Sequence, residues 1–330
     1  MNVRRRLISA TAVTAATALG LGALSACSSD SAATGNTDKF DVVASFYPMA
    51  FLAEQIGGDH ANVTSLTEPG QEPHDLEIST KQRAQLEEAD AALFLKGLQP
   101  AVDEAVSQTG IKTKIDAAGL TTLEDHGSTE HEHEGEGEGE GEKGHAEEKG
   151  NAEEEEHARD PHIWLDPVKY AEVAEGVGKA FEKADPDHAA DYKKNTAALV
   201  KKLNGLDGDF ENGLKNTKTK VFFTNHAAFG YLAERYGLTQ EAISGLDPES
   251  EPSAARVKEL QQEAKADGVT TVFYETLVSD KTAKTLAKDA KLKTDVLDPL
   301  EGITDKSRGD DYFQVMEANL KALQAALGAK

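Results

Sequence analysis

Three histidines of this chain lie where predicted strands end or a predicted helix begins. His74 comes soon after one predicted strand, His226 directly follows another, and His162 lies just before a predicted helix. Ligand sites in open α/β sheets form outside the carboxyl ends of the strands, so His74 and His226 are placed to converge from two lobes on one cleft. Neutral imidazole nitrogen is a common ligand of transition metals. The three positions therefore predict a metal site.

A carboxylate is expected to complete this site. Asp298, at the end of the last predicted strand, is the best-placed candidate, and Glu275, at the end of the strand before it, is the competitor. Three imidazoles and one carboxylate form a tetrahedral set that suits Zn²⁺, whereas Mn²⁺ prefers more oxygen ligands. Asp75 and Asp166 lie close to the predicted ligands in sequence and could accept hydrogen bonds from their imidazoles.

The other histidines fall into two groups. His60 lies in a turn and His188 near a helix start, so both are expected to be structural. The remaining five lie in or beside a Gly- and Glu-rich segment, 124–158, which has too few apolar residues to build a core and predicts a disordered insertion. This segment could be a solvated acidic spacer, but we favour low-affinity zinc capture by its histidines, which are His126, His131, His133, His145 and His157.

Strand and helix patterns alternate in two separate regions, which predicts an α/β fold with two lobes. Short β-branched runs alternate with helical patterns in 39–185 and again in 218–330. Such alternation favours parallel sheets with helices on both faces. The metal site is then expected in the cleft between an N-terminal lobe, 39–185, and a C-terminal lobe, 218–330.

Residues 186–217 between the lobes predict one long connecting helix. Apolar side chains recur there at three- and four-residue spacing and form one stripe. The stripe consists of Tyr192, Thr196, Leu199, Leu203, Leu206, Phe210 and Leu214. Gly205 and Gly208 interrupt the pattern and weaken this prediction.

The first 27 residues predict an export signal. Three arginines precede an apolar stretch that ends in Leu24-Ser25-Ala26-Cys27, which resembles the bacterial lipobox, and a flexible tether, 28–38, follows. A retained membrane-spanning helix is the alternative, but the stretch is weakly hydrophobic and no basic stop-transfer cluster follows it. We expect Cys27 to carry acyl chains that anchor the protein to a membrane surface outside the cytoplasm.

Composition excludes two classes of site. The formal net charge is −24, which argues against nucleic-acid binding. Cys27 is the only cysteine, so a lipid on it leaves no thiol for disulfides or for a cysteine-based metal site.

Four motifs together resemble those of the metal-specific solute-binding lipoproteins of ABC importers, in their zinc branch (ZnuA-like, cluster A-I). The motifs are Glu72-Pro73-His74-Asp75-Leu76-Glu77, Asp160-Pro161-His162-Ile163-Trp164-Leu165-Asp166-Pro167, the segment from Asn225 to Leu238 and Leu297-Asp298-Pro299-Leu300-Glu301. The resemblance covers nearly the whole mature chain. It implies two lobes joined by one helix, metal bound between them by His74, His162, His226 and Asp298, and delivery to a membrane permease. The manganese branch usually has a carboxylate where His226 stands, which favours zinc.

Other functions remain as alternatives to zinc delivery. These are a manganese-binding protein of the same family, a surface adhesin and an exported zinc hydrolase. The hydrolase is disfavoured because the sequence has no His-Glu-x-x-His helix and because Asp298 can close the site. We therefore expect a monomeric binding protein and not an enzyme.

Overall fold

The N-terminal lobe is built on a parallel sheet. The computed structural model describes residues 39–126 and 159–329. The sheet has the order β2-β1-β3-β4, and its strands are β1 (Phe40–Ala44), β2 (Ala61–Ser65), β3 (Ala91–Phe94) and β4 (Thr113–Asp116). Helices α1 (Tyr47–Gly57), α2 (Thr80–Glu88) and α3 (Pro100–Gln108) connect them. Ser79 caps α2 and forms a capping box with Gln82, which fixes where this helix starts.

Side chains of each strand alternate between the two faces of this sheet. Val42 and Leu93 pack with α1 on one face, whereas Val43 and Ala92 pack with α2 and α3 on the other. Both faces are therefore buried, as is usual for a parallel sheet.

The C-terminal lobe repeats this order as β6-β5-β7-β8, again with parallel pairing. Its strands are β5 (Val221–Thr224), β6 (Thr239–Ala242), β7 (Thr271–Tyr274) and β8 (Lys293–Val296), and its helices are α6 (Gly230–Arg235), α7 (Ala254–Ala266), α8 (Lys281–Ala290) and α9 (Tyr312–Leu327). The predicted α/β fold with two parallel sheets is confirmed.

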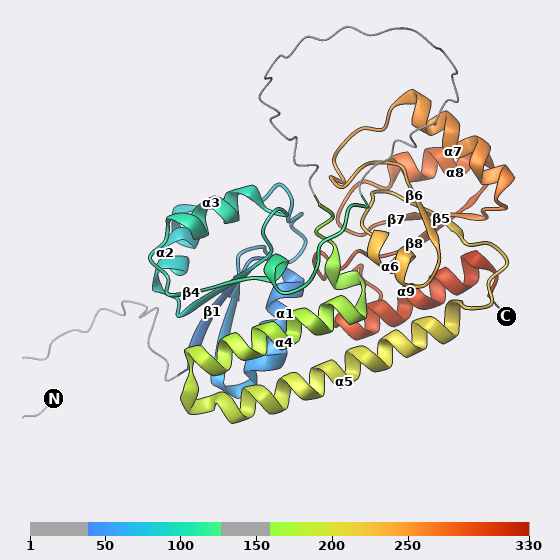
Figure 1. Ribbon diagram of the computed structural model, residues 1–330. Coiled ribbons are helices and arrows are strands. Elements are labelled where there is room, and N and C mark those ends of the chain that lie inside the picture. The colour runs from blue at the N-terminus through green and yellow to red at the C-terminus, as the bar shows by residue number, and fades with distance from the viewer. Residues whose placement is uncertain (1–38, 127–158, 330) are drawn as a thin grey trace, which may run out of the picture. The chain divides into compact units, whose positions relative to one another are not determined.

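Two long helices lie side by side below the sheets in Figure 1: α4 (Pro167–Ala184) and α5 (Ala189–Leu214). Helix α5 lies within the predicted connecting segment, 186–217, whose first residues instead form a short 3₁₀ turn, Pro186–His188. The buried residues of α5 are the seven of the predicted stripe. Gly205 and Gly208 lie inside this helix without breaking it.

The two lobes share buried contacts. The indole Nε1–H of Trp164 donates to the carbonyl oxygen of Pro299 at 2.7 Å, and the hydroxyl of Tyr312 donates to the carbonyl oxygen of Trp164 at 2.7 Å. Helix α9 lies beside α5, where the Gln324 amide donates to the carbonyl oxygen of Gly213 at 3.3 Å. These contacts fix the loops at the strand ends against one another.

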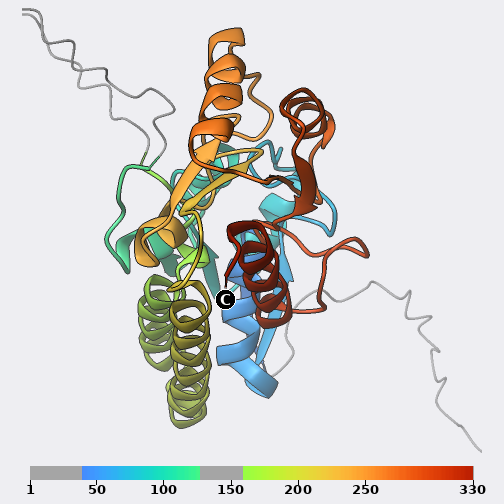
Figure 2. The ribbon, with the colours of Figure 1, turned by 90° about the vertical axis from the view of Figure 1, so that its right-hand side faces the viewer.

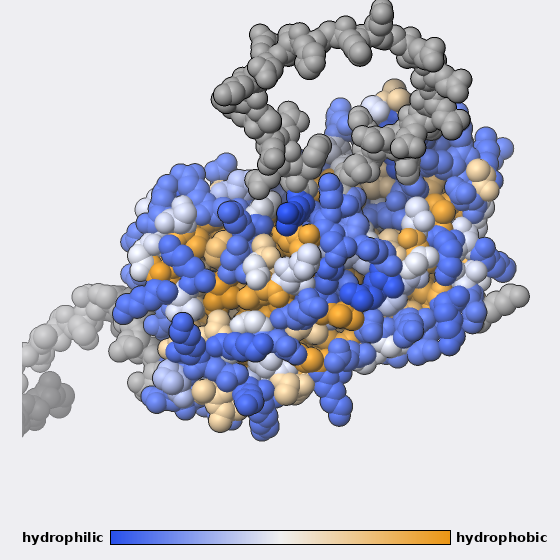
Figure 3. Space-filling view, in the orientation of Figure 1, coloured by the Kyte–Doolittle hydropathy of each residue, from blue (hydrophilic) through white to orange (hydrophobic). Residues whose placement is uncertain are grey.

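Hydrophilic residues cover most of the face shown in Figure 3, with smaller hydrophobic areas between them. Among the described residues, no helix is both long and apolar enough to cross a membrane.

Candidate metal site

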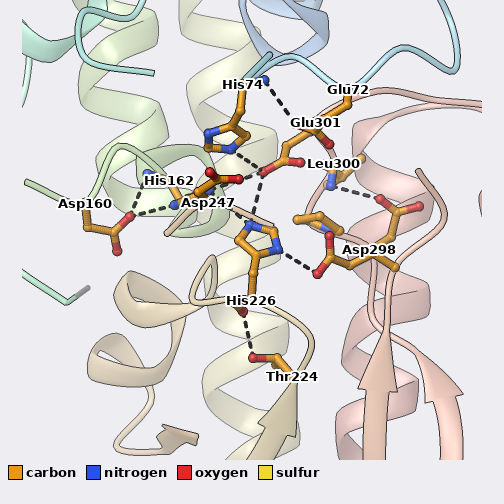
Figure 4. A network of polar contacts seen from close by, with 12 residues as sticks. Glu72, His74, Asp160, His162, Thr224, His226, Asp247, Asp298, Leu300 and Glu301 are labelled. Atoms are coloured by element: carbon orange, nitrogen blue, oxygen red, sulfur yellow. Dashed lines mark hydrogen bonds and ion pairs between the residues drawn. The ribbon is translucent and has the colours of Figure 1, made fainter. Parts of the chain in front are cut away.

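His74, His162, His226 and Glu301 meet between the two sheets (Figure 4). His74 lies in the loop between β2 and α2, His162 in the segment before α4, His226 in the segment after β5 and Glu301 in the loop after β8. The side chains of His162 and His226 are fully buried and that of Glu301 is 1% exposed, whereas that of His74 is 12% exposed. Solvent therefore reaches this group mainly at His74.

Four of the six distances between the ligand atoms of this group match a tetrahedral zinc site. Oε1 of Glu301 lies 3.3 Å from Nε2 of His74, 3.2 Å from Nε2 of His162 and 3.4 Å from Nε2 of His226. The Nε2 atoms of His162 and His226 are 3.4 Å apart. Ligand atoms about 2.0–2.1 Å from a tetrahedral Zn²⁺ would be about 3.3–3.4 Å from one another. Oε2 of Glu301 is buried without a hydrogen-bond partner among the described residues, which also fits a cation at this place.

Two carboxylates orient the buried imidazoles from behind. Nδ1–H of His162 donates to Oδ1 of Asp160 at 2.8 Å, and Nδ1–H of His226 donates to Oε1 of Glu275 at 2.6 Å. Each bond places the lone pair on Nε2, facing the centre of the group, as is usual for metal-binding histidines. Glu275, the predicted alternative ligand, therefore lies behind His226 and outside the group of four.

Neither Asp75 nor Asp166 plays the predicted part of imidazole partner. Asp75 is exposed. Asp166 caps α4 by accepting from the N–H of Val168 at 2.9 Å and forms an ion pair with Arg235 at 2.6 Å. The Asp166-Pro167 pair is a local helix-start signal, so the sequence could have shown that this carboxylate is used in capping.

The structure places Glu301, and not the predicted fourth ligand Asp298, beside the three histidines. Oδ1 of Asp298 accepts from the N–H of Leu300 at 2.9 Å, and Oδ2 accepts from the hydroxyl of Thr276 at 3.2 Å. Leu300 is fully buried with a φ of 60°, a left-handed conformation that is unusual for leucine. Asp298 thus holds a turn that directs Glu301 into the site. The left-handed position is a leucine and not a glycine, so the sequence does not reveal it, and only the Glu301 at the end of the fourth motif indicated the ligand.

The charges in this group are strongly interdependent. Burial favours neutral imidazole, but the hydrogen bonds that the ring donates to Asp160 and Glu301 outweigh this effect and raise the pKa of His162. The charges of Glu275 and Glu301 likewise outweigh burial and raise the pKa of His226 well above its usual value. Burial would raise the pKa of Glu301, but the charge of His226 and hydrogen bonds from the three imidazoles hold it well below its usual value. Without metal, the imidazoles of His162 and His226 therefore retain protons, whose positive charge offsets the buried carboxylates.

Glu72 adds a further carboxyl group beside this site. Its Oε1 accepts from the N–H of His74 at 3.0 Å. Burial, and then the charge of Glu301, raise the pKa of Glu72 to about 8. Near neutral pH it is therefore mostly uncharged and adds little repulsion to the site.

The other histidines that the structure describes lie elsewhere. His60 and His188 stack on each other at a centroid distance of 4.1 Å and pair with Asp191 and Asp185. His126, which the sequence analysis placed in the insertion, packs against Tyr231 of α6 with ring centroids 4.5 Å apart. Cys27 and the remaining insertion histidines (His131, His133, His145 and His157) lie outside the described residues.

In sequence and fold, the chain is similar to known zinc-uptake components. A family model described as "ZnuA: Zinc-uptake complex component A periplasmic" matches residues 42–326. The "Zinc-binding lipoprotein AdcA" of Streptococcus pneumoniae is 39% identical over 312 residues, which are 91% of this chain and 58% of that protein. The chain thus spans little more than half the length of this relative. The "High-affinity zinc uptake system protein ZnuA" of Bacillus subtilis is 36% identical, over 94% of this chain and 98% of that protein.

A solved structure shows the same fold. The Zn(II)-bound ZnuA-like domain of AdcA from Streptococcus pneumoniae superimposes with a TM-score of 0.69 at 35% identity. The match covers 88% of this chain and 99% of that domain.

Proposed function

Because the chain belongs to the ZnuA family of zinc-uptake components, we propose that it binds Zn²⁺ outside the cytoplasm and delivers the ion to the permease of an ABC importer. The observation that carries this proposal is the group of three Nε2 atoms around one carboxylate oxygen, with the spacing of a tetrahedral zinc site. His74, His162, His226 and Glu301 are the proposed ligands. The ion is cargo, so the protein must release it as well as hold it.

The donor set favours zinc over manganese. Three nitrogens and one oxygen suit Zn²⁺, whereas Mn²⁺ prefers a larger share of oxygen ligands. Nδ1–H of His226 donates to Glu275, which holds the ring so that its Nε2 faces the ion beside the oxygen of Glu301 from the same lobe. A manganese cargo is therefore the weaker alternative.

The site also favours binding over catalysis. A catalytic zinc has three protein ligands and keeps its fourth position open for water or substrate. Here Glu301 fills the fourth position and is buried. We therefore propose that the protein has no enzymatic activity.

We propose that acyl chains on Cys27 hold a monomer at the membrane surface, close to the permease. The lipobox-like Leu24-Ser25-Ala26-Cys27 supports this anchor, and the 39% identical relative is named a lipoprotein. The Gly- and Glu-rich insertion carries histidines near the site in sequence, and we propose that it collects zinc at low affinity before the ion enters.

Metal competition on the full chain tests the zinc assignment. Zn²⁺ should bind and resist displacement by a large excess of Mn²⁺. His226→Asp should lower the ratio of Zn²⁺ affinity to Mn²⁺ affinity, because it replaces a nitrogen ligand with an oxygen ligand. His188→Asp is the matched control, since this histidine lies outside the site, and it should leave the preference unchanged. Displacement of Zn²⁺ by equimolar Mn²⁺ in the unmodified protein would contradict zinc as the cargo.

A cellular assay tests delivery. Deletion of the gene should impair growth in zinc-depleted medium, and the unmodified chain should restore it. A Glu301→Gln chain should restore growth less well. If both chains restored growth equally, growth would not depend on Glu301, and this result would contradict the proposed site.

A further inference from the structure

A second group of potential metal ligands lies beside the first. It consists of Glu124 and His126, just before the insertion, and Glu234 of α6. Nε2 of His126 lies 2.7 Å from Oε2 of Glu234 and 3.9 Å from Oε2 of Glu124. One ligand atom from each residue lies within 4.8 Å of the other two, which is close enough for all three to contact one ion.

One buried carboxylate connects this group to the proposed zinc ligands. Oδ2 of Asp160 lies 3.1 Å from Nδ1 of His126, and Oδ1 of the same residue lies 2.8 Å from Nδ1 of His162. Asp160 is fully buried. Asp160 therefore orients the imidazole of His126 as it orients that of His162. A hydrogen bond at Nδ1 directs the Nε2 lone pair of His126 toward the neighbouring carboxylates.

The backbone around His126 is fixed by specific contacts. The hydroxyl of Tyr231 donates to the carbonyl oxygen of Asp160 at 2.7 Å and accepts from the N–H of Glu124 at 2.8 Å. A Cβ atom at Gly230 would lie 2.3 Å from Cβ of His126, so a glycine is needed there for the histidine to pack against α6. This arrangement positions the imidazole before any ion binds.

The group borders open space at Glu124 and Glu234, and it carries excess negative charge. A cavity of 230 Å³ lies beside it, lined by Glu124, Asp166, Lys169, Tyr231, Glu234 and Arg235. Lys169 pairs with the other oxygen of Glu124 at 2.5 Å, and Arg235 pairs with Asp166. These two cations leave Glu234 and Asp160 to be balanced by His126 or by a bound cation.

We propose that Glu124, His126 and Glu234 form a second divalent-metal site, whose imidazole is oriented by the carboxylate that also orients His162. One nitrogen and two oxygens suit Zn²⁺ and related divalent ions. This site is weaker than the first, because it offers three ligands and the side chain of Glu234 is 61% exposed. The proposal goes beyond zinc delivery and requires neither the importer nor the first site to be occupied.

Zn²⁺ binding to the full chain tests the second site once the other insertion histidines are removed. His131, His133, His145 and His157 are replaced by Asn, and bound Zn²⁺ per chain is measured by titration calorimetry together with competition against a chelator of known affinity. We expect two ions, one tight and one at least tenfold weaker. His126→Asn and Glu234→Gln, each added to this background, should remove the weaker ion and leave the tight one.

Two controls make the outcome decisive. Glu211→Gln removes an equal charge from an exposed position on α5 and should leave both ions bound. His74→Ala should weaken the tight ion only. Binding of a single ion in the background chain, or a second ion that persists after both His126→Asn and Glu234→Gln, would overturn the second site. Loss of the tight ion from every chain would instead overturn the proposed zinc function, so the two failures are distinguishable.

Discussion

At the scale of single residues, the fourth ligand position shows how a turn decides which carboxylate reaches the site. Asp298 and Glu301 are three residues apart and both are buried, yet they face different partners. Asp298 accepts hydrogen bonds that hold the turn at Leu300, and Glu301 lies among the imidazoles. Substitution should therefore separate a ligand from a residue that only supports one.

Glu301→Gln should weaken Zn²⁺ binding more than Asp298→Asn does. Loss of a residue that orients a ligand typically costs about 10–100-fold in metal affinity. The loss of Zn²⁺ affinity from Asp298→Asn should stay within this range, since Asn keeps an oxygen that can accept from the N–H of Leu300. The loss from Glu301→Gln should exceed this range. Chelator competition on both purified chains gives the comparison, and a larger loss from Asp298→Asn would restore Asp298 as the ligand.

Zinc affinity should fall as the pH is lowered from about 8 to 5, because ligand imidazoles must be neutral. The pKa values of His162 and His226 are raised in the metal-free protein, so protons are retained at higher pH than in a free imidazole. Proton competition should then begin above pH about 6.5 and strengthen below it, by about tenfold per pH unit for each proton displaced. A titration series at several pH values measures this slope, and a flat profile would exclude the three-histidine site.

At the scale of elements, the connecting helix keeps two glycines that no contact requires. A Cβ atom at Gly205 or Gly208 would meet nothing within 4 Å, and both residues lie inside α5. By contrast, a Cβ atom at Gly178 of α4 would lie 2.3 Å from the hydroxyl oxygen of Thr196, where α4 and α5 pack closely. The same substitution should therefore have opposite effects in the two helices.

Gly205→Ala should raise the free energy of unfolding by about 0.5–1 kcal/mol, because alanine loses less backbone entropy in a helix. Gly178→Ala should lower the free energy of unfolding by about 1–3 kcal/mol, because its methyl group overfills the contact with Thr196. Urea unfolding followed by circular dichroism measures both. Destabilisation by Gly205→Ala would mean that α5 needs flexibility at this position.

At the scale of the whole molecule, the proposed ligands come from four loops in both lobes, so one ion would connect both halves of the fold. Zn²⁺ at 100 times its Kd should stabilise the folded state by about 2.7 kcal/mol. For a protein of this size, with an unfolding entropy of about 2.1 cal/mol/K per residue, the gain corresponds to a rise in Tm of about 4 °C. Differential scanning calorimetry with Zn²⁺ and after chelation measures this change, with Mg²⁺ as the control ion. Two separate transitions, of which zinc shifts only one, would contradict a site shared by both lobes.

The sequence by itself was enough to predict the repeated α/β lobes and the buried stripe of the connecting helix. These features follow from local periodicity, which depends on few long-range contacts. His74, His162 and His226 were predicted as a group because each lies after a predicted strand or in a loop, where side chains of the two lobes can face one cleft. The cap at Ser79 is equally local.

Only the tertiary structure decided which acidic residues serve these histidines. Glu275 reaches His226 across 49 positions of sequence, and Glu301 reaches His162 across 139. The left-handed position at Leu300 is not a glycine that would reveal it. His126 was assigned to the insertion on composition, because its partners Asp160 and Glu234 are distant in sequence and leave no local signal. Carboxylates are common along this acidic chain, so composition could not choose among them. The choice depends on the packing of the two lobes, which brings loops that are far apart in sequence within hydrogen-bonding distance.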